Sequence, residues 1–159
     1  MGEICTLSKK DFEDIVTVDY ESDHQGDKER NITKEDMTKE LKDRFLINQE
    51  LFFGYKENNE LLGYITFKPF FPGHKHCEIY WLAVRKEHQN KGIGSKLLGY
   101  IELYAKEHNF RKICLYTGKD MLTTRKFYEN RGYSFVNEFQ DYYGFDTGNT
   151  TAVLYAKKL

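Results

Sequence analysis

The sequence has little proline and little cysteine, and neither sign of charge is in excess. Pro69 and Pro72 are its only prolines and fall in one loop, so no proline-rich linker divides the 159 residues. The three cysteines are odd in number and lack Cys-x-x-Cys spacing, which favours buried reduced thiols over disulfides or a zinc site. With 24 lysines and arginines against 25 aspartates and glutamates, the net charge of -1 argues against a nucleic-acid-binding protein.

Long hydrophobic runs are also missing. No apolar stretch approaches the roughly 20 residues of a membrane span, and the opening residues MGEICTLSKK lack the apolar core of a signal peptide. We therefore expect a cytoplasmic protein with no membrane and no nucleic acid among its partners. A chain of 159 residues buries enough surface to fold without a metal or a disulfide. The sequence thus predicts a single domain over residues 1–159.

Aromatic residues are plentiful, with 12 tyrosines and 12 phenylalanines, which favours β-sheet. Ser8 with Asp11, and Thr33 with Asp36, have the spacing of helix-capping boxes. Hydrophobic periodicity and turn signals predict the following segments in order: strand Glu3–Leu7, helices after Ser8 and after Thr33, strands Leu51–Tyr55, Leu61–Phe67 and Glu78–Val84, helix Gly92–His108, strand Lys112–Thr117, helix Thr123–Arg131, strand Tyr133–Phe139, a turn at Asp146–Asn149 and strand Thr151–Lys157. This order predicts an α/β fold with a mixed, mostly antiparallel sheet of about seven strands and helices on both faces.

The most informative segment leads from a strand into the longest helix and reads Gln89-Asn90-Lys91-Gly92-Ile93-Gly94-Ser95-Lys96. The first N–H groups of a helix lack internal partners and carry partial positive charge, so they attract phosphate. Gly92 and Gly94 would let a phosphate approach the backbone, and Lys91 and Lys96 add positive charge. Leu97 stands where a dinucleotide-binding loop needs its third glycine, so that motif does not fit. An ordinary strand–turn–helix without a ligand remains an alternative.

Two motifs resemble the GNAT superfamily of N-acetyltransferases. Gln89-Asn90-Lys91-Gly92-Ile93-Gly94 fits Q-x-x-G-x-G, the loop that holds the acetyl-CoA pyrophosphate in that family. Further along, Arg125–Tyr133 is close to the family pattern [LF]-Y-E-x-x-G-[FY]. The motifs, their separation and the element order agree over Ile4–Leu159, and the chain is identified as a member on that basis. The resemblance implies acetyl-CoA as cosubstrate, no metal, and an amine acceptor attacked directly in a ternary complex.

The same resemblance implies the residues that contact acetyl-CoA. Its pantetheine arm would dock like an extra strand on a backbone that splays, helped by a bulge, near Val84. A main-chain N–H of this strand would receive the oxyanion. Family members often have asparagine where Met121 stands, so Thr123 or Thr124 would supply that contact. The implied cofactor-binding residues are Leu82, Ala83, Val84, Gln89, Asn90, Lys91, Gly92, Ile93, Gly94, Ser95, Lys96, Thr124 and Tyr128.

Two catalytic residues follow from the resemblance. Tyr128 corresponds to the tyrosine that protonates the departing CoA thiolate, and a phenol is protonated at neutral pH. Its alternative role is packing between helix and sheet. Glu78 corresponds to a glutamate that removes the amine proton through water, and burial in its strand would favour that task. Its alternatives are a solvent-exposed glutamate or one paired with Lys75 or another cation.

The acceptor amine is implied only as a class. In the family its groove is built from segments that here are Tyr20–Arg30 and Asp141–Asn149, whose carboxylates suit a cationic amine, although solubility explains them equally well. One alternative is a protein N-terminus, because Phe139–Tyr143 resembles the Tyr-Tyr loop of the ribosomal-protein-acetylating branch, although Tyr116 replaces that branch's glutamate. Another alternative is a catalytically weak CoA-sensing module. A metal site at His74–Cys77 is less favoured, and a homodimer is the default assembly.

Overall fold

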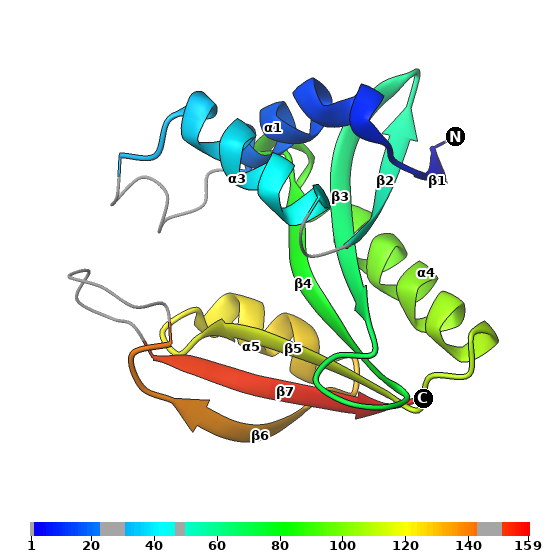
Figure 1. Cartoon of the computed structure of the whole chain (residues 1–159), viewed down its shortest axis with the longest axis vertical. Coiled ribbons are helices and arrows are strands. Elements are labelled where there is room, and N and C mark those ends of the chain that lie inside the picture. Colours follow the sequence, from blue (N-terminus) through cyan, green and yellow to red (C-terminus); the bar gives the residue numbers. More distant parts are fainter. Residues whose placement is uncertain (1, 23–30, 47–49, 143–150) are drawn as a thin grey trace. The chain divides into compact units, whose positions relative to one another are not determined.

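The computed structural model describes residues 2–22, 31–46, 50–142 and 151–159 (Figure 1). Seven strands form one sheet in the order β1-β2-β3-β4-β5-β7-β6, in which β4 and β5 are parallel. The elements are β1 (Glu3–Thr6), α1 (Phe12–Glu21), α3 (Lys34–Leu46), β2 (Leu51–Glu57), β3 (Glu60–Pro69), β4 (His76–Val84), α4 (Ile93–Glu107), β5 (Lys112–Gly118), α5 (Leu122–Glu129), β6 (Ser134–Phe139) and β7 (Ala152–Lys158), with short 3-10 turns η1 (Lys9–Asp11) and η2 (Lys86–His88). The predicted α/β class and order of helices and strands are confirmed.

Both predicted capping boxes are present. Ser8 N–H donates to Asp11 Oδ2 over 2.8 Å, and Thr33 N–H donates to Asp36 Oδ2 over 3.0 Å. Such pairs satisfy backbone donors that the first helical turn leaves unpaired. The Ser8 box opens the 3-10 turn η1, and α1 proper begins only at Phe12.

The hairpin between β2 and β3 turns at Asn58 and Asn59, whose φ angles are +52° and +65°. A two-residue hairpin turn of this kind needs left-handed backbone at both positions, which asparagine tolerates. Glu57 and Glu60 face each other across the turn and fix the register of the pair. The sequence predicts these two strands as Leu51–Tyr55 and Leu61–Phe67, and its turn signal between them is Glu57-Asn58-Asn59-Glu60, which the structure confirms. The predicted turn at Asp146–Asn149 lies outside the described residues.

The chain divides into two compact units, and each is described by itself. Unit 1 comprises Met1–Lys68 and Tyr80–Tyr104, and unit 2 comprises Pro69–Ile79 and Ala105–Leu159. The strand β4 and the helix α4 each contribute residues to both units. The single domain expected from the sequence stays a prediction.

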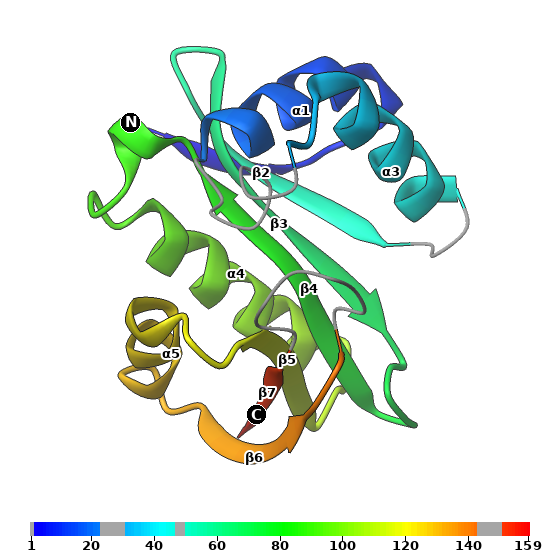
Figure 2. The same ribbon diagram turned by 90° about the vertical axis from the view of Figure 1, so that its left-hand side faces the viewer.

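In unit 1, helices cover both faces of β2 and β3. Consecutive strand residues point to opposite faces, and Phe52 belongs to the core cluster beneath α1 and α3, while Phe53 packs against Tyr100 and Tyr104 of α4. Figure 2 shows α1 and α3 side by side over the strands. The alternation of adjacent phenylalanines therefore builds two apolar layers from one strand.

A buried ion pair lies within unit 1. Arg44 of α3 donates to Glu50 Oε2 over 3.0 Å, and both side chains are almost fully excluded from solvent. The Arg44 guanidinium also lies 4.9 Å from the Tyr80 ring and 5.5 Å from the Trp81 ring. Two consecutive aromatic residues of β4 therefore lie near this one guanidinium.

Replacing Arg44 with methionine is expected to destabilise the protein by about 3–5 kcal/mol, because the buried Glu50 carboxylate loses its cation. Urea unfolding measures the change. The double variant Arg44→Met/Glu50→Met removes both charges and should recover most of the loss. A single variant within about 1 kcal/mol of wild type would contradict this account, since surface pairs contribute only that much.

In unit 2, β7 lies between β5 and β6, and its Val153 and Tyr155 are fully buried together with Ile113 of β5. The beginning of β4 pairs with β5 from His76 opposite Lys112 to Ile79 opposite Leu115. Gly132, with φ +83°, follows α5 and turns the chain toward β6. No helix among the described residues has both the length and the apolar character that a membrane span requires.

Candidate functional site

The loop between β4 and α4 leaves the first turn of the helix open. Gly92 has φ +84°, in the left-handed region that favours glycine, and a Cβ built there would meet no heavy atom within 4 Å. Lys96 N–H donates to the Gly92 carbonyl over 3.0 Å, which starts the helical ladder at Gly92. The N–H groups of Ile93 and Gly94 therefore belong to the turn that has no earlier helical carbonyl to bind.

Gln89 fixes the start of this loop. Its Nε2 donates to the Val84 carbonyl over 3.0 Å and to the Ser22 carbonyl over 2.9 Å, so it joins the ends of β4 and α1. The sequence suggested Gln89 only as a contact to a ligand. The structure shows that both amide hydrogens hold protein carbonyls, which makes the side chain a support for the loop.

The two lysines predicted near the phosphate site differ in their surroundings. Lys91 is exposed, as are Asn90 and Gly92. Lys96 Nζ lies 3.2 Å from Tyr55 Oη and 5.0 Å from the centre of that ring. Sequence reasoning did not identify Tyr55 as a partner, because 41 positions separate the two residues.

The end of β4 packs closely on β3. Ala83 is buried, and a Cβ at Gly63 would lie 2.9 Å from the Ala83 carbonyl oxygen and 3.1 Å from Cγ2 of Val84. Only glycine allows the backbones to approach this closely. The Arg85 N–H, just after β4, donates a hydrogen bond to the Leu62 carbonyl of β3. Leu82 and Val84 are partly exposed.

Arg85 makes a charged contact that the sequence did not predict. Its guanidinium pairs with Glu60 and lies 3.3 Å from Glu21. A hollow of about 400 Å³ surrounds these groups, lined by Glu21, Glu60, Arg85, Lys86, Glu87 and His88. None of the residues predicted to bind a cofactor lines it.

In unit 2, Tyr128 lies on α5 and is 6% exposed. Its ring meets Phe127 and Tyr133 edge-on, with centroid distances of 5.1 and 5.6 Å. Burial raises the pKa of the Tyr128 phenol well above its ordinary value, so the hydroxyl keeps its proton at neutral pH. Thr124 is one helical turn earlier and is partly exposed.

Glu78 lies on β4 opposite Cys114 of β5 and is only 3% exposed. The alternative of a solvent-exposed glutamate is therefore wrong. Tyr116 is two residues beyond Cys114 on β5, so it lies on the same face of the sheet as Glu78. Burial, and secondly the charge of Glu78, raise the pKa of the Tyr116 phenol.

Three aromatic rings gather in unit 2. Tyr116 stacks on Tyr142 with a centroid distance of 4.7 Å, and Phe139 lies 5.8 Å from Tyr116 and 6.4 Å from Tyr142. We call Tyr116, Phe139 and Tyr142 the aromatic cluster. The sequence singled out the segment around Tyr142, but the contact of this segment with Tyr116 of β5 appears only in the structure.

The thiols are unsuited to nucleophilic chemistry. Burial raises the pKa of Cys77 to about 12 and also raises that of Cys114, and the Cys77 thiol donates to the Lys112 carbonyl. Cys5 is partly exposed, so the expectation of buried thiols is correct for Cys77 and Cys114 but wrong for Cys5. Within the described ranges, no group of three His, Cys, Asp or Glu side chains could hold a metal ion, and this includes His74–Cys77.

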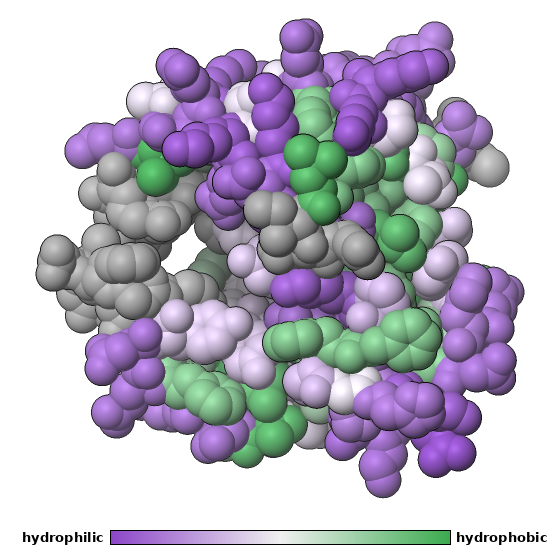
Figure 3. All heavy atoms as spheres, in the orientation of Figure 1, coloured by the Kyte–Doolittle hydropathy of each residue, from purple (hydrophilic) through white to green (hydrophobic). Residues whose placement is uncertain are grey.

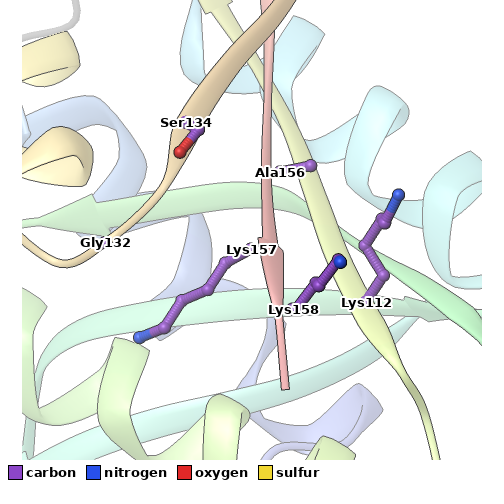
Figure 4. Close-up of a pocket in the computed structure, with 6 residues that line it drawn as sticks. All are labelled: Lys112, Gly132, Ser134, Ala156, Lys157 and Lys158. Atoms are coloured by element: carbon purple, nitrogen blue, oxygen red, sulfur yellow. The ribbon is translucent and has the colours of Figure 1, made fainter.

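A second hollow, of about 250 Å³, lies at the end of the unit 2 strands (Figure 4). Its lining includes Lys112, Lys157 and Lys158. Figure 4 shows Lys112 and Lys158 on one side of β7 and Lys157 extending to the other. Because the three ammonium groups do not converge, this hollow does not form an anion site, and none of the predicted site residues lines it.

Comparisons with known proteins agree with the fold. The model of the acetyltransferase (GNAT) family matches residues 10–133. Bacillus subtilis YdhI, an uncharacterized protein, is 36% identical over 88 residues, which are 55% of this chain and 52% of YdhI, so the chain spans about half the length of this curated relative.

Two solved structures extend the comparison to nearly the whole chain. The ribosomal-protein-S18-alanine N-acetyltransferase of Escherichia coli has a TM-score of 0.80 at 15% identity, covering 99% of this chain and 94% of that one. A GNAT family acetyltransferase of Elizabethkingia anophelis with acetyl-CoA bound has a TM-score of 0.75 at 21% identity, covering 99% and 98%.

Proposed function

We propose that this chain, which belongs to the acetyltransferase (GNAT) family, transfers an acetyl group from acetyl-CoA to a primary amine. The family membership confirms the resemblance inferred from the two sequence motifs and makes the chain an acyltransferase. The observation that carries the proposal is the open first turn of α4 at Gly92, with its left-handed backbone and unfilled space. An anion is the ligand that such a helix start favours.

The loop would hold the pyrophosphate of acetyl-CoA. N–H groups of Gly92–Ser95 would donate to its oxygens, and the exposed Lys91 would add positive charge. Gln89 would act by keeping the loop in place, since its amide already binds two carbonyls. Backbone groups of Leu82–Val84 would receive the pantetheine arm as a short added strand. Asn90, Lys96 and Thr124 would also contact acetyl-CoA.

The chemical step would be direct attack. The amine nitrogen forms a bond to the thioester carbonyl carbon, a backbone N–H of β4 donates to the oxyanion, and the C–S bond then breaks. Tyr128 would give its phenolic proton to the departing thiolate, and its buried, protonated hydroxyl supports that role. Glu78 would accept the amine proton through water. Its position within β4, away from bulk water, supports the role.

The test is binding followed by turnover. Isothermal titration with acetyl-CoA measures the first, and release of the CoA thiol on a panel of amines measures the second. The panel contains alkylamines, aminoglycosides, lysine peptides and peptides with free N-termini. Turnover restricted to N-termini would favour the protein-acetylating alternative, and binding without release on any amine would favour the sensing module. Absence of acetyl-CoA binding would overturn the proposal.

Glu78→Gln should lower kcat/KM for the amine by about 100-fold and remove the acidic limb of its pH profile, because glutamine cannot accept a proton. Steady-state rates between pH 5 and 9 measure this. Glu138→Gln is the matched control, since Glu138 is an exposed glutamate of the same unit paired with Lys119. An unchanged acidic limb in Glu78→Gln would exclude Glu78 as the base.

A further inference from the structure

The last turn of α1 is joined to β4 and to the loop that follows it. The Trp81 Nε1–H donates to Asp19 Oδ1 over 2.6 Å, and the Gln89 amide donates to the Ser22 carbonyl over 2.9 Å. Asp19 lies in α1, and Ser22 directly follows the helix. One end of a single helix thus holds two points of the segment that the proposal assigns to acetyl-CoA.

The sequence of α1 puts these contacts on its inner face. Ile15, Val18, Asp19 and Ser22 have the spacing of one side of a helix. Ile15 and Val18 are fully buried in the core of unit 1. Figure 3 shows mostly hydrophilic side chains at the top of the view, where Figure 1 places α1 and α3. The apolar part of the inner face therefore fixes α1 on the core, and its polar end contacts β4 and the loop.

Trp81 is held from two sides. Arg44 of α3 lies 5.5 Å from the centre of its ring, and Asp19 of α1 accepts its N–H. The side chain is partly buried and packs against the core cluster of unit 1. A tryptophan N–H that leaves water needs an acceptor. The hydrogen bond to Asp19 therefore selects one orientation of the indole.

The part of β4 that follows Trp81 depends on such support. The register of β4 with β5 ends at Ile79 opposite Leu115, so within the described ranges no β5 residue pairs with Leu82–Val84. A strand edge without this pairing can take an added strand, but it lacks the hydrogen bonds that would fix its conformation. Trp81 before this segment and Gln89 after it supply fixed points, because both are bound to the end of α1.

We propose that Asp19 is a positioning residue for acetyl-CoA. By accepting the Trp81 N–H it fixes the end of β4, so that the backbone of Leu82–Val84 already has the shape that receives the pantetheine arm. Asp19 would act through Trp81, without contact to the ligand. This inference rests on the proposed function and adds to it a residue outside both sequence motifs. A site that is shaped before the ligand arrives binds more tightly, because less ordering accompanies binding.

Asp19→Leu removes the acceptor and keeps a side chain of similar size. We expect its Kd for acetyl-CoA to rise by about 5- to 20-fold, the effect of losing one hydrogen bond that shapes the site. Isothermal titration with the full chain measures Kd. With an amine that supports turnover, KM for acetyl-CoA should rise by a similar factor, while kcat stays within about 2-fold of wild type. Partial unfolding would instead lower the apparent kcat and leave KM unchanged.

Three further variants separate the hydrogen bond from other effects. Asp19→Asn keeps a side-chain oxygen that can accept the Trp81 N–H, so its affinity should stay within about 3-fold of wild type. Asp14→Leu is the matched control with unchanged affinity, because Asp14 is an exposed aspartate in the first turn of the same helix. Trp81→Phe removes the donor and should weaken binding as Asp19→Leu does. The double variant Asp19→Leu/Trp81→Phe should bind no more weakly than either single variant, since both remove the same interaction.

Trp81 also gives a spectroscopic signal, because it is the only tryptophan of the chain. The indole band in near-ultraviolet circular dichroism should weaken in Asp19→Leu, where the ring loses its fixed orientation. It should keep its wild-type strength in Asp19→Asn and Asp14→Leu. Saturating acetyl-CoA should restore the band in Asp19→Leu, since the bound pantetheine arm would then order the end of β4.

The outcomes distinguish this inference from the proposed function. Wild-type affinity in Asp19→Leu, or additive losses in the double variant, would overturn the positioning role and leave the acetyl-CoA site in place. If Asp19→Leu does not fold, wild-type affinity in Trp81→Phe would overturn it, and weaker binding there would support it. Failure of the wild-type protein to bind acetyl-CoA would overturn the proposed function, and the inference with it.

Discussion

Gly92→Asp is expected to weaken acetyl-CoA binding by about 100-fold. At about 5 Å and an effective dielectric constant near 20, a carboxylate and a phosphate charge repel by about 3 kcal/mol, which corresponds to that factor. Aspartate tolerates the left-handed backbone at Gly92 better than most residues, and no atom lies within 4 Å of the position where its Cβ would stand. The variant should therefore fold while losing the anion. Isothermal titration with acetyl-CoA measures the affinity.

Gly92→Asn is the matched control for this substitution. Asparagine has nearly the same shape as aspartate, tolerates the left-handed backbone at φ +84° and carries no charge. Its affinity for acetyl-CoA should fall by less than about 10-fold, since only a small backbone strain is added. If both variants bind acetyl-CoA as wild type does, the loop does not hold the pyrophosphate. Equal losses in both would indicate steric exclusion instead of charge repulsion.

Tyr128→Phe is expected to lower kcat by at least about 100-fold, because phenylalanine has no proton to give to the thiolate. The phenyl ring keeps the edge-on contacts with Phe127 and Tyr133. Affinity for acetyl-CoA and thermal stability should therefore change little. Rapid-mixing measurement of thiol release at saturating substrates separates this loss from slow product release.

The pH profile gives an independent check on Tyr128. Its pKa is raised by burial, and a phenol is the proton donor only below its pKa. Wild-type kcat should therefore show no decline from loss of this proton up to about pH 10, the ordinary pKa of a tyrosine. Tyr133→Phe is the matched control, since Tyr133 is a buried tyrosine packed against Tyr128. A Tyr128→Phe enzyme with wild-type kcat would leave Tyr128 as a packing residue.

Structural features formed by residues close together in the sequence were predictable. The capping pairs Ser8–Asp11 and Thr33–Asp36 are three residues apart, and the Asn58–Asn59 turn depends only on its own backbone. Because these interactions are local, the sequence pattern already contains both partners. The sequence also placed Gly92 at the start of a helix, whereas its left-handed backbone was seen only in the structure.

Contacts between distant positions were not predictable in this way. The Gln89 amide reaches Ser22 across 67 positions, and Arg44 of α3 meets the Tyr80 and Trp81 rings of β4. Which side chains meet depends on strand register, and a shift of one residue would turn each side chain to the other face. No pattern within a single segment carries that information.

The sequence by itself determined the order of helices and strands, the glycine at the start of α4 and, through two motifs, the family. It left open whether Glu78 faces water, how Tyr116 meets Phe139 and Tyr142, and whether Gln89 serves a ligand or the loop. The tertiary structure decided these points by burying Glu78 beside β5, by bringing the three rings together and by giving Gln89 two carbonyls to bind. The physical reason is that backbone conformation follows from neighbours in the chain, whereas burial and side-chain contact follow from which strands pair and in which register.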